Sequence, residues 1–198
     1  MQPSSSPRTT HAPPRVFAAA VIAFVALAAA LMLGGGWPAL QALGVPTMDL
    51  PWADARTVTG AGVALAEGLD PLLENPGDPW GRPLNYPRVW LALARLGVGP
   101  DDTWALAWAF FAALVVGLVT LVPLARTRHG AIVLAVALFA PTTWFGLERA
   151  NNDLLLFGLC ALAARAATLR PPAAAALVVV AGVLKLYPAA ALAGLLAS

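Results

Sequence analysis

Acidic, basic and amide side chains gather at four places in this 198-residue chain, each of them beside an apolar run. A carboxylate can take a proton from a hydroxyl group, and arginine or lysine can offset the negative charge of a phosphate. Amides and carboxylates also supply the hydrogen bonds that a hydroxyl-rich ligand needs. The candidate functional residues are Asp54, Arg56, Arg82, Asn85, Tyr86, Arg88, Glu148, Arg149, Asn151, Asn152, Asp153, Lys185 and Tyr187.

The first group is Asp54 and Arg56, which follow the first apolar run, with Asp49 just upstream. Residues 57–69 can form a short amphipathic helix that lies in the membrane interface. Asp54 then has two interpretations, a functional carboxylate or a side chain that simply caps this helix. The spacing alone favours the cap. The apolar stripe of the helix is Val58, Ala61, Leu65 and Leu69.

The second group is a proline-rich stretch, residues 70–88, in which five prolines exclude a continuous helix. We expect an ordered outer loop that is anchored by Trp80 and Tyr86. Arg82 and Arg88 can then make forked contacts with a phosphate, beside aromatic rings that suit a sugar or a lipid headgroup. The alternative is an interfacial belt of aromatic residues with snorkelling arginines, and the stretch alone favours that alternative.

The third group is the segment 148–153, Glu-Arg-Ala-Asn-Asn-Asp, in which five of six side chains are polar. It separates two apolar runs. A hairpin turn in which Asn152 or Asp153 caps the next helix would explain one or two of these residues. It does not explain a Glu-Arg pair and two amides, so we expect the segment to contact a polar ligand.

The fourth group is Lys185, a single lysine within an apolar helix, with Tyr187 two positions later. Ionisable groups at membrane depth are costly and are therefore functional candidates. The ammonium group of Lys185 either snorkels to the membrane surface or provides a point charge for an anionic phosphate. The sequence favours neither interpretation over the other.

The composition excludes several classes of protein. Apolar residues make up 60% of the chain and charged residues 11%, against roughly 45–50% and about 25% in soluble domains. A net charge of +2 is too small for a nucleic-acid binder. One cysteine and two distant histidines suit neither a disulfide framework nor a metal site, and no glycine-rich phosphate loop or nucleophile elbow is present. We therefore expect an integral membrane protein with no metal or other cofactor.

Five apolar runs indicate an all-α, polytopic transmembrane helical bundle with about five spans. We expect the first run to be retained as a span, because it is longer than the core of a signal peptide. Residues 1–15 would form a disordered cytoplasmic tail, and residues 37–103 a long outer loop. Pro141 breaks the third run. The expected spans are residues 16–33, 104–124, 131–147, 154–169 and 173 to 188 or beyond.

Basic residues cluster at alternate ends of these runs, within residues 8–15, 126–128 and 165–170. Such clusters mark cytoplasmic loops. We therefore expect a multi-pass protein of the plasma membrane with a cytoplasmic N-terminus and with all four polar groups on its outer face. The last apolar run continues to Ser198 without a basic stop, so we expect residues 16–198 to form a transmembrane domain in a truncated chain; the alternative is a last span that ends on the outer side.

The order of these motifs is shared with a known family. An acid after the first span is followed by Gly-Leu-Asp-Pro at 68–71, Asn-Tyr-Pro at 85–87, Arg-Ala-Asn-Asn-Asp at 149–153 and Leu-Lys-Leu-Tyr-Pro at 184–188. This order resembles the GT-C superfamily of polytopic membrane glycosyltransferases, especially glycosyltransferase family 87, the polyprenol-phosphate-mannose-dependent mannosyltransferases. The resemblance corresponds to the N-terminal half of such an enzyme.

The resemblance implies a hexosyltransferase of the cell envelope, which moves mannose or another hexose from a polyprenyl-phosphate donor to an acceptor hydroxyl with inversion. Asp54 matches the family's catalytic aspartate, and Asp49 is the second choice. Lys185, Arg82 or Arg149 would offset charge on the leaving phosphate. The implied partners are the lipid-linked donor, membrane lipids and a glycan or lipid acceptor. Further matches to the family's motifs are Asn151, Asn152, Asp153, Tyr187 and Pro188.

Two other classes remain open. A transporter or flippase segment would share the intramembrane charge but would place broken helices around a midplane cavity. The other is a non-catalytic membrane scaffold, or an inactive remnant of an enzyme, which the apolar run up to Ser198 favours. An enzyme requires Asp54 within about 10 Å of the 151–153 turn and of Lys185, over one outer cavity, to leave room for a sugar.

Overall fold

The computed structural model describes residues 15–125, 127–167 and 169–186. This part of the chain contains helices and no β-strand, so the all-α fold expected from the sequence is confirmed. The helices are α1 (Arg15–Gly34), η1 (Trp37–Leu43), α2 (Ala53–Ala66), η2 (Arg88–Trp90), α3 (Leu91–Arg95), η3 (Pro100–Asp102), α4 (Thr103–Leu121), η4 (Val122–Leu124), α5 (Arg128–Leu138), α6 (Pro141–Arg149), α7 (Asp153–Ala167) and α8 (Pro171–Leu184), where η marks a 3-10 helix.

Two helical segments are long and apolar enough to cross a membrane, Arg15–Gly34 and Pro100–Leu121. A third candidate is the pair α5 and α6, which meet at a 46° bend beside Pro141, a residue that cannot continue the helical hydrogen bonds. α7 and α8 have 15 and 14 residues, fewer than the roughly 20 that a bilayer core requires. The described residues therefore provide two or three candidate spans, and the expected five are not confirmed.

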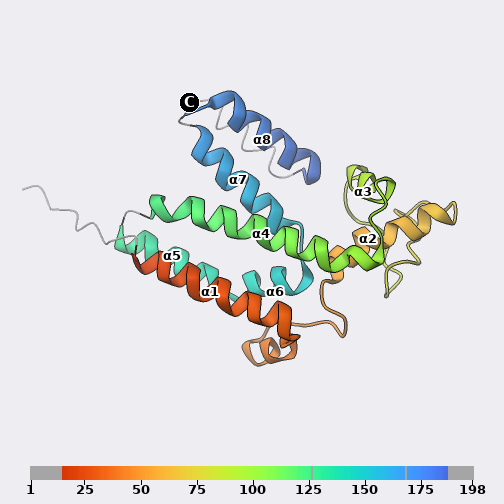
Figure 1. Cartoon of the computed structure of the whole chain (residues 1–198), viewed down its shortest axis with the longest axis horizontal. Coiled ribbons are helices and arrows are strands. Elements are labelled where there is room, and N and C mark those ends of the chain that lie inside the picture. The colour runs from red at the N-terminus through yellow and green to blue at the C-terminus, as the bar shows by residue number, and fades with distance from the viewer. Residues whose placement is uncertain (1–14, 126, 168, 187–198) are drawn as a thin grey trace, which may run out of the picture.

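Two glycines allow α4 and α7 to pack closely. A Cβ atom on Gly117 would lie 2.8 Å from the ring of Phe157, and one on Gly158 would overlap the carbonyl group of Ala113. Small residues at a crossing let membrane helices approach one another. α7 also packs beside α8, and α1 beside α5 (Figure 1).

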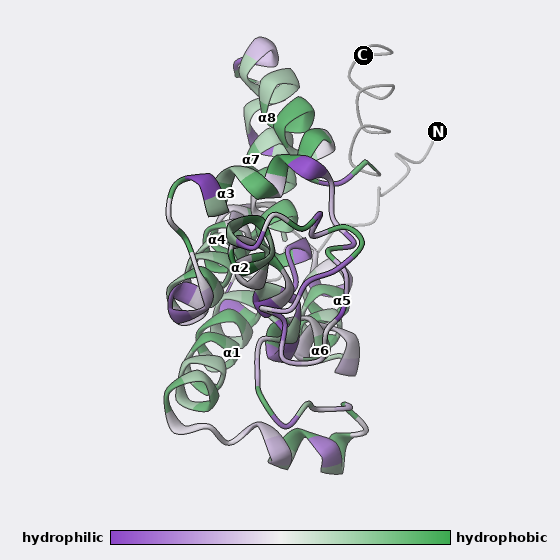
Figure 2. Cartoon of the chain, turned by 90° about the vertical axis from the view of Figure 1, so that its right-hand side faces the viewer, coloured by the Kyte–Doolittle hydropathy of each residue, from purple (hydrophilic) through white to green (hydrophobic). Residues whose placement is uncertain are grey.

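The polar segments lie at one end of the helices. α2, α3 and their loops sit where α4 begins, where α6 ends and α7 begins, and where α8 ends (Figure 1, right). Figure 2 views the molecule from this end, with hydrophilic loops in front of hydrophobic helices. We call residues 37–102 the polar lobe. The side of the membrane that the polar lobe faces stays a prediction from the arginine pattern.

The helix expected over residues 57–69 begins earlier and is more deeply buried than predicted. α2 begins at Ala53, and residues 57–61 are all buried. Gly60 contacts the backbone of Gly77, so the proline-rich loop crosses directly over the helix. α2 therefore packs inside the polar lobe.

The proline-rich loop has no helix between residues 67 and 87, as its prolines predict. Leu84 N donates to Pro71 O at 2.7 Å, which closes the loop on itself. Asn75 Nδ2 donates to Thr57 O at 2.9 Å, which ties the loop to α2. The loop therefore presents its side chains to α2 in one fixed arrangement.

Candidate functional site

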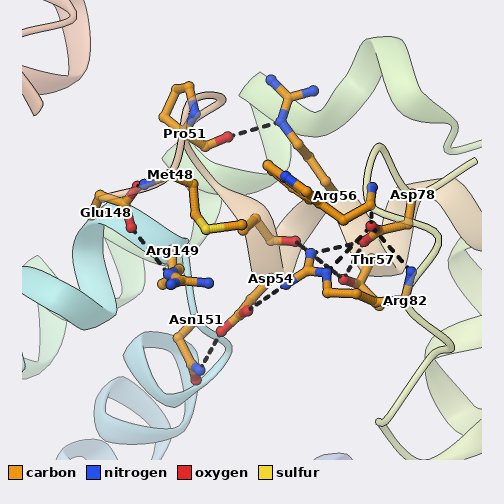
Figure 3. A network of polar contacts seen from close by, with 12 residues as sticks. Met48, Pro51, Asp54, Arg56, Thr57, Asp78, Arg82, Glu148, Arg149 and Asn151 are labelled. Atoms are coloured by element: carbon orange, nitrogen blue, oxygen red, sulfur yellow. Dashed lines mark hydrogen bonds and ion pairs between the residues drawn. The ribbon is translucent and has the colours of Figure 1, made fainter. Parts of the chain in front are cut away.

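Asp54 lies in the first turn of α2, and its carboxylate faces a distant segment of the chain. Oδ2 accepts a hydrogen bond from Asn151 Nδ2 at 2.6 Å, although the two residues are 97 positions apart. Oδ1 lies 3.8 Å from Arg82 Nη1. Trp52, not Asp54, occupies the N-cap of α2. The capping interpretation of Asp54, which the spacing favoured, is therefore wrong (Figure 3).

Arg82 joins the proline-rich loop to the start of α2. Its Nη2 donates to Asp78 Oδ2 at 2.8 Å and to Thr57 Oγ1 at 2.7 Å, and the Asp78 side chain is fully buried. Burial works to raise the pKa of Asp78, but the hydrogen bonds from Arg82 and Thr57 outweigh it and lower this pKa below its ordinary value. The ionised Asp78 therefore holds Arg82 beside Asp54, so this arginine does not snorkel in an interfacial belt.

The C-terminal end of α6 holds the segment that leads into α2. Met48 N donates to Glu148 Oε1 at 2.9 Å, and Trp52 N donates to Glu148 O at 2.8 Å. Glu148 is fully buried, and Arg149 Nε lies 3.2 Å from its Oε2. The backbone of Trp52 has a φ of +65°, which is strained for a bulky residue. Glu148 thus fixes a strained turn just before Asp54.

The turn between α6 and α7 brings a second charged pair to this place. Asn151 Oδ1 accepts from Asp153 N at 2.9 Å, so Asn151 supplies the side-chain hydrogen bond predicted for Asn152 or Asp153 at the start of α7. Lys185 Nζ donates to Asp153 Oδ1 at 2.8 Å and to Asn152 Oδ1 at 3.4 Å. Lys185 therefore ties the end of α8 to this turn and does not snorkel away from it. We call the following residues the polar cluster: Asp54, Asp78, Arg82, Tyr86, Glu148, Arg149, Asn151, Asn152, Asp153 and Lys185.

Tyr86 is a buried member of the polar cluster. Its ring centroid lies 5.9 Å from Lys185 Nζ. Burial, followed by the negative charges of Asp54 and Asp153, raises the pKa of the Tyr86 hydroxyl above its ordinary value. Tyr86 is therefore a neutral hydroxyl group near two carboxylates. Tyr187 lies outside the described residues.

Three predicted site residues direct their side chains to other partners or to the surface. Arg56 Nε donates to Pro51 O at 2.8 Å, with its guanidinium directed away from Asp54 (Figure 3). Arg88 pairs with Asp70 at 2.7 Å in an exposed position, and Asn85 is also exposed. Their assignment to a ligand stays a prediction.

An apolar cavity of about 400 Å³ lies beside the polar cluster. Side chains from α1, α4, α5, α6 and α7 line it, and Asn151 and Asp153 are among its polar wall residues. Asn151 also bonds Asp54, and Asp153 also bonds Lys185. The cavity therefore meets the polar cluster at the α6–α7 turn. Its apolar wall includes Phe17, Leu114, Leu118, Leu134, Leu138 and Phe157.

Sequence reasoning missed Asp78, because no local pattern indicates its burial. Asp78 and Arg82 lie four residues apart in a loop that five prolines force to fold back. That spacing pairs side chains only within a helix, so this contact depends on how the loop folds over α2. The approach of Asp54 to the 151–153 turn, in contrast, is predicted for an enzyme. In the structure Asp54 Oδ2 accepts a hydrogen bond from Asn151 Nδ2 of this turn at 2.6 Å.

The polar cluster combines a partly exposed carboxylate, a lysine, side-chain amides and a neutral tyrosine hydroxyl. These groups can accept a proton, offset negative charge and donate hydrogen bonds to a polar ligand. Over the described ranges, no group of three or more His, Cys, Asp or Glu side chains is placed to hold a metal ion. Comparisons of the chain with protein-family models, with curated proteins and with solved structures find no match.

Proposed function

We propose that this protein is a membrane glycosyltransferase, which transfers a hexose from a polyprenyl-phosphate donor to an acceptor hydroxyl. One observation supports this most. Asp54 and Lys185, from distant parts of the chain, contact the same 151–153 turn beside an apolar cavity. A lipid-linked sugar needs this combination, because its chain is apolar while its phosphate and sugar are polar. The motif order that resembles glycosyltransferase family 87 points to the same reaction.

Asp54 acts as the general base in this proposal. Its carboxylate takes the proton of the acceptor hydroxyl, whose oxygen attacks the anomeric carbon of the donor sugar. The bond from that carbon to the phosphate oxygen breaks, and its electron pair leaves with the polyprenyl phosphate. Attack from the opposite face inverts the anomeric configuration. The Asp54 side chain retains 21% exposure, which leaves room for a hydroxyl group to approach it.

Lys185 is the cation that we assign to the leaving phosphate. It contacts the N-terminal end of α7, where helix dipoles also favour negative charge. Arg82 and Arg149, the other candidates, are each paired with a fully buried carboxylate, whereas Asp153, the partner of Lys185, is 48% exposed. We therefore assign Arg82 to the orientation of Asp54 and leave the phosphate to Lys185.

The apolar cavity would hold the first isoprenoid units of the donor. Its volume of about 400 Å³ lies within the range of roughly 300–1,000 Å³ that ligand pockets occupy. Its wall is mainly leucine and phenylalanine, with Asn151 and Asp153 where it meets the α6–α7 turn and Thr142 and Thr143 at the start of α6. A donor in this cavity would place its phosphate at that turn, in front of Lys185 and beside Asp54.

The test is hexose transfer by the full chain in lipid nanodiscs, from polyprenyl-phosphate mannose and polyprenyl-phosphate glucose to a panel of glycan and lipid acceptors. Asp54→Asn removes the base and keeps its shape, so it should lower transfer by about 10²–10⁴-fold. Glu67→Gln is the matched control, because Glu67 is an exposed carboxylate at the other end of α2. Wild-type rates in Asp54→Asn, or no transfer from either donor by the unaltered chain, would contradict the proposal.

A transporter or flippase segment is the second candidate. The 46° bend between α5 and α6 gives a broken helix beside the cavity, and broken helices are typical of transporter sites. A flippase would move a fluorescent polyprenyl phosphate between the leaflets of a vesicle. Such movement with no accompanying sugar transfer would favour this candidate over the enzyme.

A further inference from the structure

The segment formed by η2 and α3 has apolar side chains on two sides. Trp90 and Leu91 point inward and are buried, and Trp90 Nε1 donates to Leu184 O at 3.0 Å. On the other side Val89 and Leu96 are 40% and 79% exposed. The inner side is therefore fixed to the rest of the protein while the outer side has no protein cover within the described residues.

A groove separates the outer side of this segment from α4. Its volume is about 390 Å³, with Leu93, Leu96 and Val98 on one wall and Ala105, Leu106 and Ala109 on the other. The small alanine side chains of α4 leave the space, and all but Asp102 of its lining residues are apolar or glycine. The groove is thus suited to an apolar chain.

The position of α4 indicates how far into a membrane this groove lies. Pro100–Leu121 is a candidate membrane span of 22 residues, about 33 Å long at the α-helical rise, which matches a bilayer core of about 30 Å. Ala109 lies about 9 Å along α4 from Thr103 by the same rise. Trp104, in the first turn, is 54% exposed, and tryptophan is enriched at membrane–water interfaces. A membrane that α4 crosses therefore reaches the groove.

We propose that residues 88–98 anchor the polar lobe in the membrane interface, and that an acyl chain of a bilayer phospholipid fills the groove between α3 and α4. Arg95, in the last turn of α3, is exposed and directs its guanidinium to the phosphate of that lipid while Leu96 enters the acyl region. The argument for a lipid is continuity, because one wall of the groove is the outer surface of a candidate span. The inference depends on α4 crossing the membrane and is independent of sugar transfer.

The test places a nitroxide spin label at Leu96→Cys in a Cys160→Ala background, which is practical because Cys160 is the only cysteine of the chain. The full chain is reconstituted in nanodiscs of a single phosphatidylcholine. Collisions with oxygen, which dissolves in lipid, are compared with collisions with a water-soluble nickel complex. The matched control is Leu73→Cys, because Leu73 is a similarly exposed leucine, at 73%, in the loop that follows α2.

The label at Leu96 should collide mainly with oxygen, and the label at Leu73 mainly with the nickel complex. Ala105→Cys, on the opposite wall of the groove, should behave like Leu96→Cys and gives a second reading if one variant folds poorly. Equal nickel accessibility at residues 96 and 73 would overturn the proposal. Exclusion of both reagents from residue 96 would also overturn it, because the groove would then be covered by a second copy of the chain or by another protein segment.

Discussion

The buried pair of Asp78 and Arg82 predicts a large loss of stability on removal of one carboxylate. Asp78→Ala removes the partner of Arg82 Nη2 at 2.8 Å and of Thr57 Oγ1 at 2.6 Å. It also removes the acceptor of Trp80 N at 2.8 Å. Five donor atoms, of Thr57, Trp80 and Arg82, thus lose this carboxylate at once.

The magnitude follows from burial. Removal of one partner from a buried ion pair costs about 3–5 kcal/mol, but the Arg82 side chain is 32% exposed and water can solvate part of its charge. We therefore expect Asp78→Ala to lower the free energy of unfolding by about 3 kcal/mol, at the lower end of that range. A freed Arg82 would then pair more closely with Asp54, 3.8 Å away, and any activity of Asp54 as a base should fall as well.

The assay is denaturant unfolding of the full chain in detergent micelles, followed by tryptophan fluorescence. Asp70→Ala is the matched control, because Asp70 pairs with Arg88 at 2.7 Å, a similar distance, but in an exposed position. Exposed ion pairs contribute little, so this variant should unfold at nearly the wild-type denaturant concentration. If both variants unfold at the same concentration, burial does not decide the strength of the Asp78 pair and the reasoning is refuted.

Three further predictions concern the same framework. The pKa of Asp78 is lower in the folded chain, so its contribution to the free energy of unfolding is complete above its unfolded pKa of about 3.9 and is lost as the pH falls through the folded value. The free energy of unfolding should therefore drop more steeply below about pH 4 in the wild type than in Asp78→Asn. In the unfolding assay, Gly158→Ala should lower the free energy of unfolding by about 1–3 kcal/mol, because the added methyl group overpacks the α4–α7 contact. Gly146→Ala should be tolerated, because its Cβ meets only an ordinary contact at 3.8 Å. Equal stability of the two variants would contradict the close α4–α7 contact. Gly77→Ala should expose the proline-rich loop to limited proteolysis, because its Cβ would overlap the backbone of Gly60, while Gly99→Ala, which meets open space, should not.

The helices were the most predictable part of this structure. Residues 16–33 and 104–124 were expected to be helical from their apolar length, and α1 and α4 lie within three residues of those limits. Span length was less predictable, because Pro141 and the 151–152 turn divide apolar sequence into helices too short to cross a bilayer core.

The polar cluster was predictable in composition but not in its pairings. Local spacing made Asp54 a suitable helix cap, yet its partner Asn151 lies 97 residues away. No local pattern indicates a contact of that range. Arg82 was assigned to a phosphate for a similar reason, since its partner Asp78 is identified only once the loop is seen to cross α2 at Gly77.

The two hydrogen bonds that Glu148 accepts from Met48 and Trp52 have a mechanical consequence. They couple α6 to the segment that leads into α2, and α6 joins α5 at the 46° bend beside Pro141. A change in that bend therefore moves Asp54 together with the α6–α7 turn, relative to the cavity wall on α5. Bilayer thickness favours a bent helix pair of matching hydrophobic length. It would in this way influence the position of the Asp54 carboxylate.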